Sequence, residues 1–90
     1  MALQQFGVRP PLVMPAEQTF ADTIAVTLSH PRDDVEIRYT LDDSYPTAAS
    51  ALYTGPITLT ETTTLRSAVF RNGLKLAERD AVRFTKPQPE

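Results

Sequence analysis

The 90-residue sequence has no cysteine and no tryptophan, and it contains only three glycines and one histidine. Without cysteine the chain cannot form disulfides, and one histidine leaves too few nitrogen and sulfur ligands for a zinc site. A chain of this length buries only about 60–65% of its unfolded surface. Its stability must therefore come from a thin apolar core and from hydrogen bonds between strands, and we expect neither a metal nor another cofactor.

The sequence also lacks an excess of positive charge and any long hydrophobic run. Nine Lys and Arg residues stand against eleven Asp and Glu residues, whereas nucleic-acid-binding domains usually present a basic stripe. No apolar run approaches the roughly 20 residues that a membrane span requires, and residues 1–6 have none of the features of a signal peptide. We expect no nucleic-acid partner, no membrane span, and either an intracellular protein or a piece of a longer chain.

The residues that are present favour short β-strands. Thr, Val, Ile, Tyr and Phe recur, and eight prolines and short polar clusters interrupt the chain about every ten residues. Two segments, 23–29 and 35–41, alternate between apolar and other residues with a period of two. Their predicted core faces carry Ile24, Val26, Leu28, Val35, Ile37, Tyr39 and Leu41.

Further strands are predicted around these two. Residues 12–14 form a short apolar segment closed by Pro15, which is typical of an edge strand, and a connection follows in which Phe20 turns toward the core. Residues 57–60, 63–71 and 74–85 also have strand patterns, whereas residues 47–52 are compatible with one helical turn. Asn72-Gly73 predicts a hairpin with a type I′ turn, because both residues tolerate positive φ. The last of these strands is expected to bury Leu76, Val82 and Phe84.

This pattern predicts a single all-β domain of six or seven strands over residues 11–85. Mixed strand lengths and long connections favour a two-sheet antiparallel sandwich over a closed barrel. Residues 1–10 are expected to form a loose lead-in. The polar, proline-rich residues 86–90 are expected to form a linker-like tail.

Several segments together resemble a known family. They are IRYTLDDSYPT at 37–47, LYTGPI at 52–57, TTLRSA at 63–68 and the turn at 72–73. In order and spacing they resemble the chitobiase/beta-hexosaminidase C-terminal domain, whose pattern runs I-x-Y-T-x-D-G-S-x-P-T, then L-Y-x-x-P-I, then T-T-L-K-A, then a glycine turn. The resemblance covers roughly residues 11–85. The chain departs from it at Asp43, where the family usually has glycine, so a positive φ there would strain the backbone.

The resemblance implies an immunoglobulin-like or fibronectin type III-like sandwich. Such domains are non-catalytic accessory or spacer modules in bacterial secreted or surface proteins, often glycoside hydrolases. The family is not known by catalytic residues, so none is carried over to this chain. The expected partners are neighbouring domains of a larger protein, the expected location is extracytoplasmic, and the domain itself is expected to be a monomer.

Several residues invite a functional interpretation. Asp42, Asp43 and Ser44 are oxygen donors, but the spacing of a calcium loop is absent and turn chemistry explains them. The carboxylate pairs 33/34 and 78/80 are expected to be solvated, because a thin sandwich offers little room for a catalytic cleft. His30, next to Pro31, is expected in an exposed loop.

The remaining candidates for ligand binding are Tyr45, Tyr53 and Asp43, in and near the proline loop. Exposed aromatic rings can stack on sugars and carry much binding energy. Two alternatives to an accessory module therefore stay open. One is a module that binds a polysaccharide or a cell-surface protein through this loop, and the other is a stand-alone protein that assembles through its sheet edges.

Overall fold

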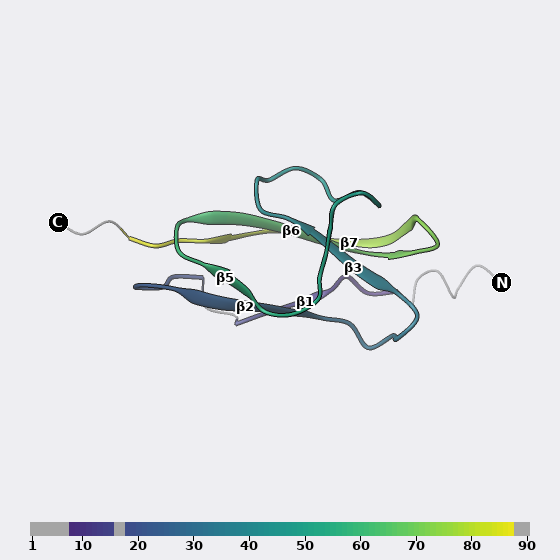
Figure 1. The fold of residues 1–90 in the computed structure, drawn as a ribbon, viewed down its shortest axis with the longest axis horizontal. Helices are drawn as coiled ribbons and strands as arrows, with labels where there is room; N and C mark the ends of the chain where they lie inside the picture. The colour runs from purple at the N-terminus through teal and green to yellow at the C-terminus, as the bar shows by residue number, and fades with distance from the viewer. Residues whose placement is uncertain (1–7, 16–17, 88–90) are drawn as a thin grey trace.

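Seven β-strands form two antiparallel sheets that pack face to face (Figure 1). The computed structural model describes residues 8–15 and 18–87, and no helix occurs among them. The strands are β1 (Leu12–Met14), β2 (Ile24–Ser29), β3 (Glu36–Thr40), β4 (Ala51–Leu52), β5 (Ile57–Leu59), β6 (Thr63–Arg71) and β7 (Leu74–Phe84). One sheet has the order β1-β2-β5 and the other β4-β3-β6-β7, which confirms the predicted all-β sandwich. Residues 1–7 of the predicted lead-in, residues 88–90 of the predicted tail, and residues 16–17 lie outside the described residues.

The core lies between the sheets and follows the predicted alternation. In β2, Val26 and Leu28 are buried, and the register places Val26 opposite Ile57 of β5. Leu65 of β6 and Phe84 of β7 face them from the other sheet, and Phe20 closes the core from the connection before β2. Burial of such side chains stabilises a fold by about 1.5–3 kcal/mol each relative to exposure, so this cluster accounts for much of what holds the sheets together.

Three local predictions were wrong. Leu41 is 41% exposed, because β3 ends at Thr40 and the chain leaves the sheet before position 41 can continue the inward alternation. Residues 47–52 form a turn in which Ser50 N–H donates to the Thr47 carbonyl at 2.9 Å, followed by the short strand β4 rather than a helical turn. Leu76 is only half-buried, because it is the extra residue where the β6–β7 register shifts between Val69 and Phe70.

The β6–β7 hairpin turns as predicted at Asn72-Gly73. Their φ values are 53° and 80°, and a type I′ turn needs both to be positive. A β-bulge lies further along the hairpin, where Ser67 pairs with Arg79 but Leu65 pairs with Val82. Because the bulge inserts one extra residue, the side chain of Arg79 lies on the inner side of the sheet.

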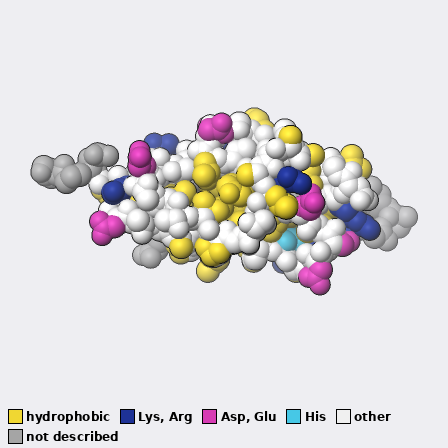
Figure 2. Space-filling model, in the orientation of Figure 1, with side chains coloured by type: hydrophobic (Ala, Val, Ile, Leu, Met, Phe, Trp, Pro, Cys, Tyr) yellow, Lys and Arg dark blue, Asp and Glu magenta, His cyan; other side chains and the backbone are white. Residues whose placement is uncertain are grey.

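The outer face of the four-stranded sheet carries mostly charged side chains, and two residues of this face are buried beneath them. Ala68 and Phe70 are almost fully buried there, and the Lys75 ammonium lies 5.9 Å from the centre of the Phe70 ring. Long charged side chains can cover apolar surface with their stems while their head groups stay in water. On the side shown in Figure 2, acidic and basic groups alternate without forming a patch of one sign.

Among the described residues, no helix has the length and hydrophobicity to cross a membrane.

Candidate functional site

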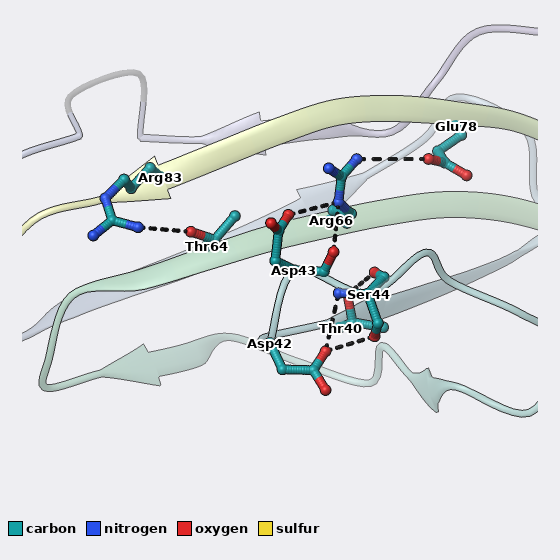
Figure 3. A network of polar contacts seen from close by, with 8 residues as sticks. All are labelled: Thr40, Asp42, Asp43, Ser44, Thr64, Arg66, Glu78 and Arg83. Carbon is teal, nitrogen blue, oxygen red and sulfur yellow. Dashed lines mark hydrogen bonds and ion pairs between the residues drawn. The ribbon is translucent and has the colours of Figure 1, made fainter.

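The loop after β3 is ordered by its own side chains (Figure 3). Ser44 donates to Asp42 Oδ1 twice, from its backbone N–H at 3.1 Å and from its hydroxyl at 2.5 Å. Thr40 donates its hydroxyl to the Ser44 carbonyl at 2.6 Å. The hydrogen bond from the Ser44 hydroxyl, followed by that from its backbone, lowers the pKa of Asp42 because both favour the carboxylate. Asp42 therefore acts as a turn-forming residue, in agreement with the turn chemistry expected for this loop.

Asp43 is the next residue, and its backbone is in the left-handed region. Its φ is 68°, which explains why the family pattern has glycine at this position. Arg66 Nε, on the neighbouring strand β6, donates to the Asp43 carbonyl at 2.9 Å and to its Oδ1 at 2.8 Å. The hydrogen bond to Asp43 raises the pKa of Arg66. The side chain that replaces glycine therefore gains an ion pair across the sheet.

Tyr45 projects from the same loop and is 65% exposed. The guanidinium carbon of Arg66 lies 4.4 Å from the centre of its ring, a cation–π distance. Arg66 Nη1 also lies 4.0 Å from Glu78 Oε2 on β7. Pro46, the residue after Tyr45, is fully buried. These contacts hold an exposed aromatic ring at a defined place on the surface.

Tyr53, the second aromatic candidate, has a structural position instead. It is half-buried against the core cluster, and its ring meets that of Tyr39 edge to face, with centres 6.5 Å apart. Its backbone N–H donates to the Ile37 carbonyl at 2.8 Å. The structure brings Asp43 and Tyr45 together around Arg66, but it does not add Tyr53 to this group.

A shallow depression of about 450 Å³ lies beside the loop. It is lined by Tyr39, Thr40, Leu41, Asp42, Ser44, Ser50 and Ala51. The lining consists of hydroxyl groups, a carboxylate and one exposed leucine. Such groups are better suited to binding a hydroxylated ligand than to catalysing a reaction of that ligand. In the part of the chain that the structure describes, no three His, Asp or Glu side chains are grouped as a metal site would require.

Arg66 and Glu78 are the members of this site that sequence reasoning missed. Their role depends on the register between β3, β6 and β7, in which Thr40 lies opposite Arg66. No local sequence motif predicts that pairing. Of the carboxylates expected as solvated pairs, Asp33, Asp34 and Asp80 are exposed, as predicted, whereas Glu78 is half-buried. Asp34 is paired with Arg32 at 2.7 Å, and this hydrogen bond lowers the pKa of Asp34, while Glu78 binds Lys75 at 2.5 Å.

Comparison with known proteins adds one positive finding. The model of the family described as the chitobiase/beta-hexosaminidase C-terminal domain matches residues 15–80. Searches of curated proteins and of solved structures returned no significant match. The matched range includes the loop with Asp43 and Tyr45 and most of the hairpin that carries Arg66 and Glu78.

Proposed function

We propose that this chain, which belongs to the chitobiase/beta-hexosaminidase C-terminal domain family, is a non-catalytic accessory module that spaces and orients the neighbouring domains of a larger protein. The parent protein would be a bacterial secreted or surface protein, such as a glycoside hydrolase, which places the module outside the cytoplasm. The membership supports this context. The positions of the first and the last described residues support the spacing role.

The first and the last described residues lie toward opposite ends of the long axis of the sandwich (Figure 1). The described residues begin near the 72–73 turn of the β6–β7 hairpin and finish beyond the other end of β7. An 11-residue strand such as β7 is about 36 Å long at the usual rise per residue. A domain built in this way keeps the domains attached at its two ends apart by roughly its own length.

The exit from β7 is hydrogen-bonded to two connecting segments, the one before β2 and the one between β5 and β6. Thr85 N–H donates to the Gln18 carbonyl at 2.7 Å, and Phe20 N–H donates to the Thr85 carbonyl at 3.0 Å. On the other side, Lys86 N–H donates to Thr62 Oγ1 at 3.0 Å and Lys86 Nζ donates to the Thr60 carbonyl at 3.2 Å. Bonds on two sides restrict rotation of the departing chain, so a domain attached after it would inherit a fixed direction.

The interior supports a non-catalytic role. Among the described residues, the only buried polar or charged one is Ser67. Acid–base or nucleophilic chemistry needs titratable groups in a sheltered site. A core of aliphatic and phenyl side chains supplies stability and leaves contacts with neighbours to the surface.

The test places residues 8–87 directly between two fluorescent reporter domains and measures the distribution of energy-transfer efficiencies. We expect one narrow distribution, whereas a Gly/Ser linker of equal length should give a broad one around a root-mean-square distance of about 50 Å. Thr62→Val removes the acceptor for Lys86 N–H and should broaden the distribution. Thr58→Val, at an exposed threonine of β5, is the matched control and should leave it unchanged. A distribution as broad as that of the linker would contradict the proposal.

A second candidate function is weak binding of a polysaccharide, and Tyr45 is the observation that favours it. Its ring is exposed and held by Arg66, and a pre-positioned aromatic ring loses little entropy on stacking against a sugar. Titration with chitin and cellulose oligosaccharides, followed by ¹⁵N NMR, should shift residues 41–47 in the parent sequence and not in Tyr45→Ala. No shift with any of these sugars would remove them as ligands.

A further inference from the structure

A second hollow opens at the end of the sandwich where the chain enters. It has a volume of about 520 Å³ and is called the basic pocket here. Its walls include the basic side chains Arg9, His30 and Arg79 and the apolar side chains Pro10, Leu12 and Pro31. None of the described residues that line it is acidic. Figure 2 shows the single histidine, in cyan, reaching the surface between the middle and one end of the molecule.

His30 has a structural role in the pocket, because its ring nitrogens are used in hydrogen bonds within the chain. It was expected in an exposed loop, but it is half-buried and both of its ring nitrogens are engaged. Its Nε2 lies 2.7 Å from the Arg9 carbonyl, and its Nδ1 accepts the Arg32 N–H at 3.2 Å. A carbonyl can only accept, so Nε2 carries the proton and the ring is the neutral tautomer in this arrangement. The imidazole thereby fixes Arg9 at the mouth of the pocket.

Arg79 supplies a positive charge that no described carboxylate pairs with. The β-bulge turns it inward from β7, where its Nη1 makes one long bond of 3.4 Å to the Pro11 carbonyl and its buried Nε has no partner. The half-buried arginines 32, 38 and 66 each have a carboxylate within 4.0 Å, whereas among the described residues Arg79 has none. A partly buried guanidinium without a counter-charge is costly, and a carboxylate is the group that best satisfies its fork of donors.

The nearby acidic residues do not fill this role. Glu78 and Asp80 share a separate shallow hollow with Arg79. Glu78 is already engaged by Lys75 and Arg66 on the outer face of the sheet. The positive charge of the basic pocket is therefore available to a ligand that enters the pocket.

We propose that the basic pocket binds the carboxylate of an acidic side chain presented by another polypeptide. Arg79 pairs with the carboxylate, Arg9 adds charge at the mouth, and the apolar wall of Leu12 and the two prolines packs against the aliphatic stem. Among the described residues that line it there is no Phe, Tyr or Trp ring on which a sugar would stack, which favours a polypeptide over an acidic saccharide. This inference does not depend on the spacer role, because a pocket of this chemistry would act in an isolated domain as well.

The experiment titrates the ¹⁵N-labelled chain with the capped peptide acetyl-Leu-Glu-Leu-amide and with its neutral match, acetyl-Leu-Gln-Leu-amide. We expect only the acidic peptide to shift the signals of Leu12, Ser29 and His30. Arg79→Gln should weaken its binding by about tenfold or more, the usual effect of losing a charge-assisted pair. Arg9→Gln should weaken it less, and Arg83→Gln, an exposed arginine on the same strand, should have no effect.

Three results would overturn the proposal. Equal shifts with both peptides would show that the carboxylate is not recognised. Unchanged affinity in Arg79→Gln and in Arg9→Gln would place binding elsewhere. A response to sodium glucuronate with none to the acidic peptide would identify an acidic sugar as the ligand in place of a polypeptide. If Arg79→Gln fails to fold, Arg9→Gln alone decides the question, because Arg9 is exposed on the lead-in segment.

Discussion

Arg66 and Asp43 are joined twice, because one Nε–H of the arginine is shared between the carbonyl and the carboxylate of the aspartate at 2.9 and 2.8 Å. The same guanidinium covers the ring of Tyr45. A residue with a strained backbone is therefore fixed to β6, one of the two inner strands of the sheet, and the exposed ring beside it is fixed as well. The stability of this loop can be tested by separating the strain from the ion pair.

Substitutions at Asp43 separate these two effects. Asp43→Gly and Asp43→Ala both remove the carboxylate, but only alanine has to keep a Cβ at a φ of 68°. We expect Asp43→Ala to have a lower free energy of unfolding than Asp43→Gly by about 1 kcal/mol, the usual cost of a left-handed residue with a side chain. Urea denaturation measures the difference. An alanine variant as stable as the glycine variant would show that the loop relaxes to negative φ.

The acid stability of the domain should depend on Asp42. Its pKa is lowered from 3.8, first by the Ser44 hydroxyl, so the carboxylate stabilises the fold above this value. The contribution should be lost as the pH falls from 3.8 through the lower pKa of the folded state. We expect Asp42→Asn to be less stable than the parent chain at pH 7 and to lose less stability on acidification.

Denaturation of the parent chain and of Asp42→Asn at a series of pH values measures this. In a Ser44→Ala background the difference between the two should shrink, because the largest cause of the shift is gone. A difference that does not change with pH would show that the carboxylate charge is irrelevant to folding.

The core prediction concerns Phe84, whose side chain is fully buried at the end of β7. Phe84→Ala should lower the free energy of unfolding by about 3–5 kcal/mol, through lost transfer energy and an unfilled cavity. Arg83→Ala, at the exposed neighbouring position, is the matched control and should change it by about 0.5 kcal/mol or less. Comparable losses for the two variants, measured by chemical denaturation, would show that the chain does not pack as described.

The oligomeric state tests how the long edge strand is protected. β7 pairs only with β6, and such an edge invites pairing between chains unless charges and bulges disrupt it. β7 carries both, including the exposed Lys75, Asp80 and Arg83. We expect a sedimentation coefficient that does not change with concentration. Replacing these three residues with valine should cause association, and a parent chain that self-associates would revive the hypothesis of assembly through sheet edges.

The parts of the fold that follow local rules were predictable from the sequence. The alternation of Ile24, Val26 and Leu28 identifies β2 and its buried face, because side chains of a strand alternate strictly. Asn72-Gly73 identifies the hairpin, since few residue pairs accept two positive φ angles. The positive φ at Asp43 was predictable only through the family pattern, which has glycine there.

The parts that depend on register and bulges were not predictable. Leu76 has the pattern of a core residue, but an extra residue in β7 moves it away from the interior. The contact between Arg66 and Tyr45, and the inward turn of Arg79, follow from the same long-range pairing. Local sequence does not encode such pairing, because a shift of one residue exchanges the faces of a whole strand.

The central claim is that the sandwich holds its two ends apart at a fixed distance. The chain has no cysteine, so Pro10→Cys and Pro87→Cys, both at exposed positions, can be spin-labelled without interference. Pulsed electron paramagnetic resonance should give one narrow distance distribution centred near the length of β7, about 36 Å. A broad distribution, or a peak at less than about half that length, would contradict the account.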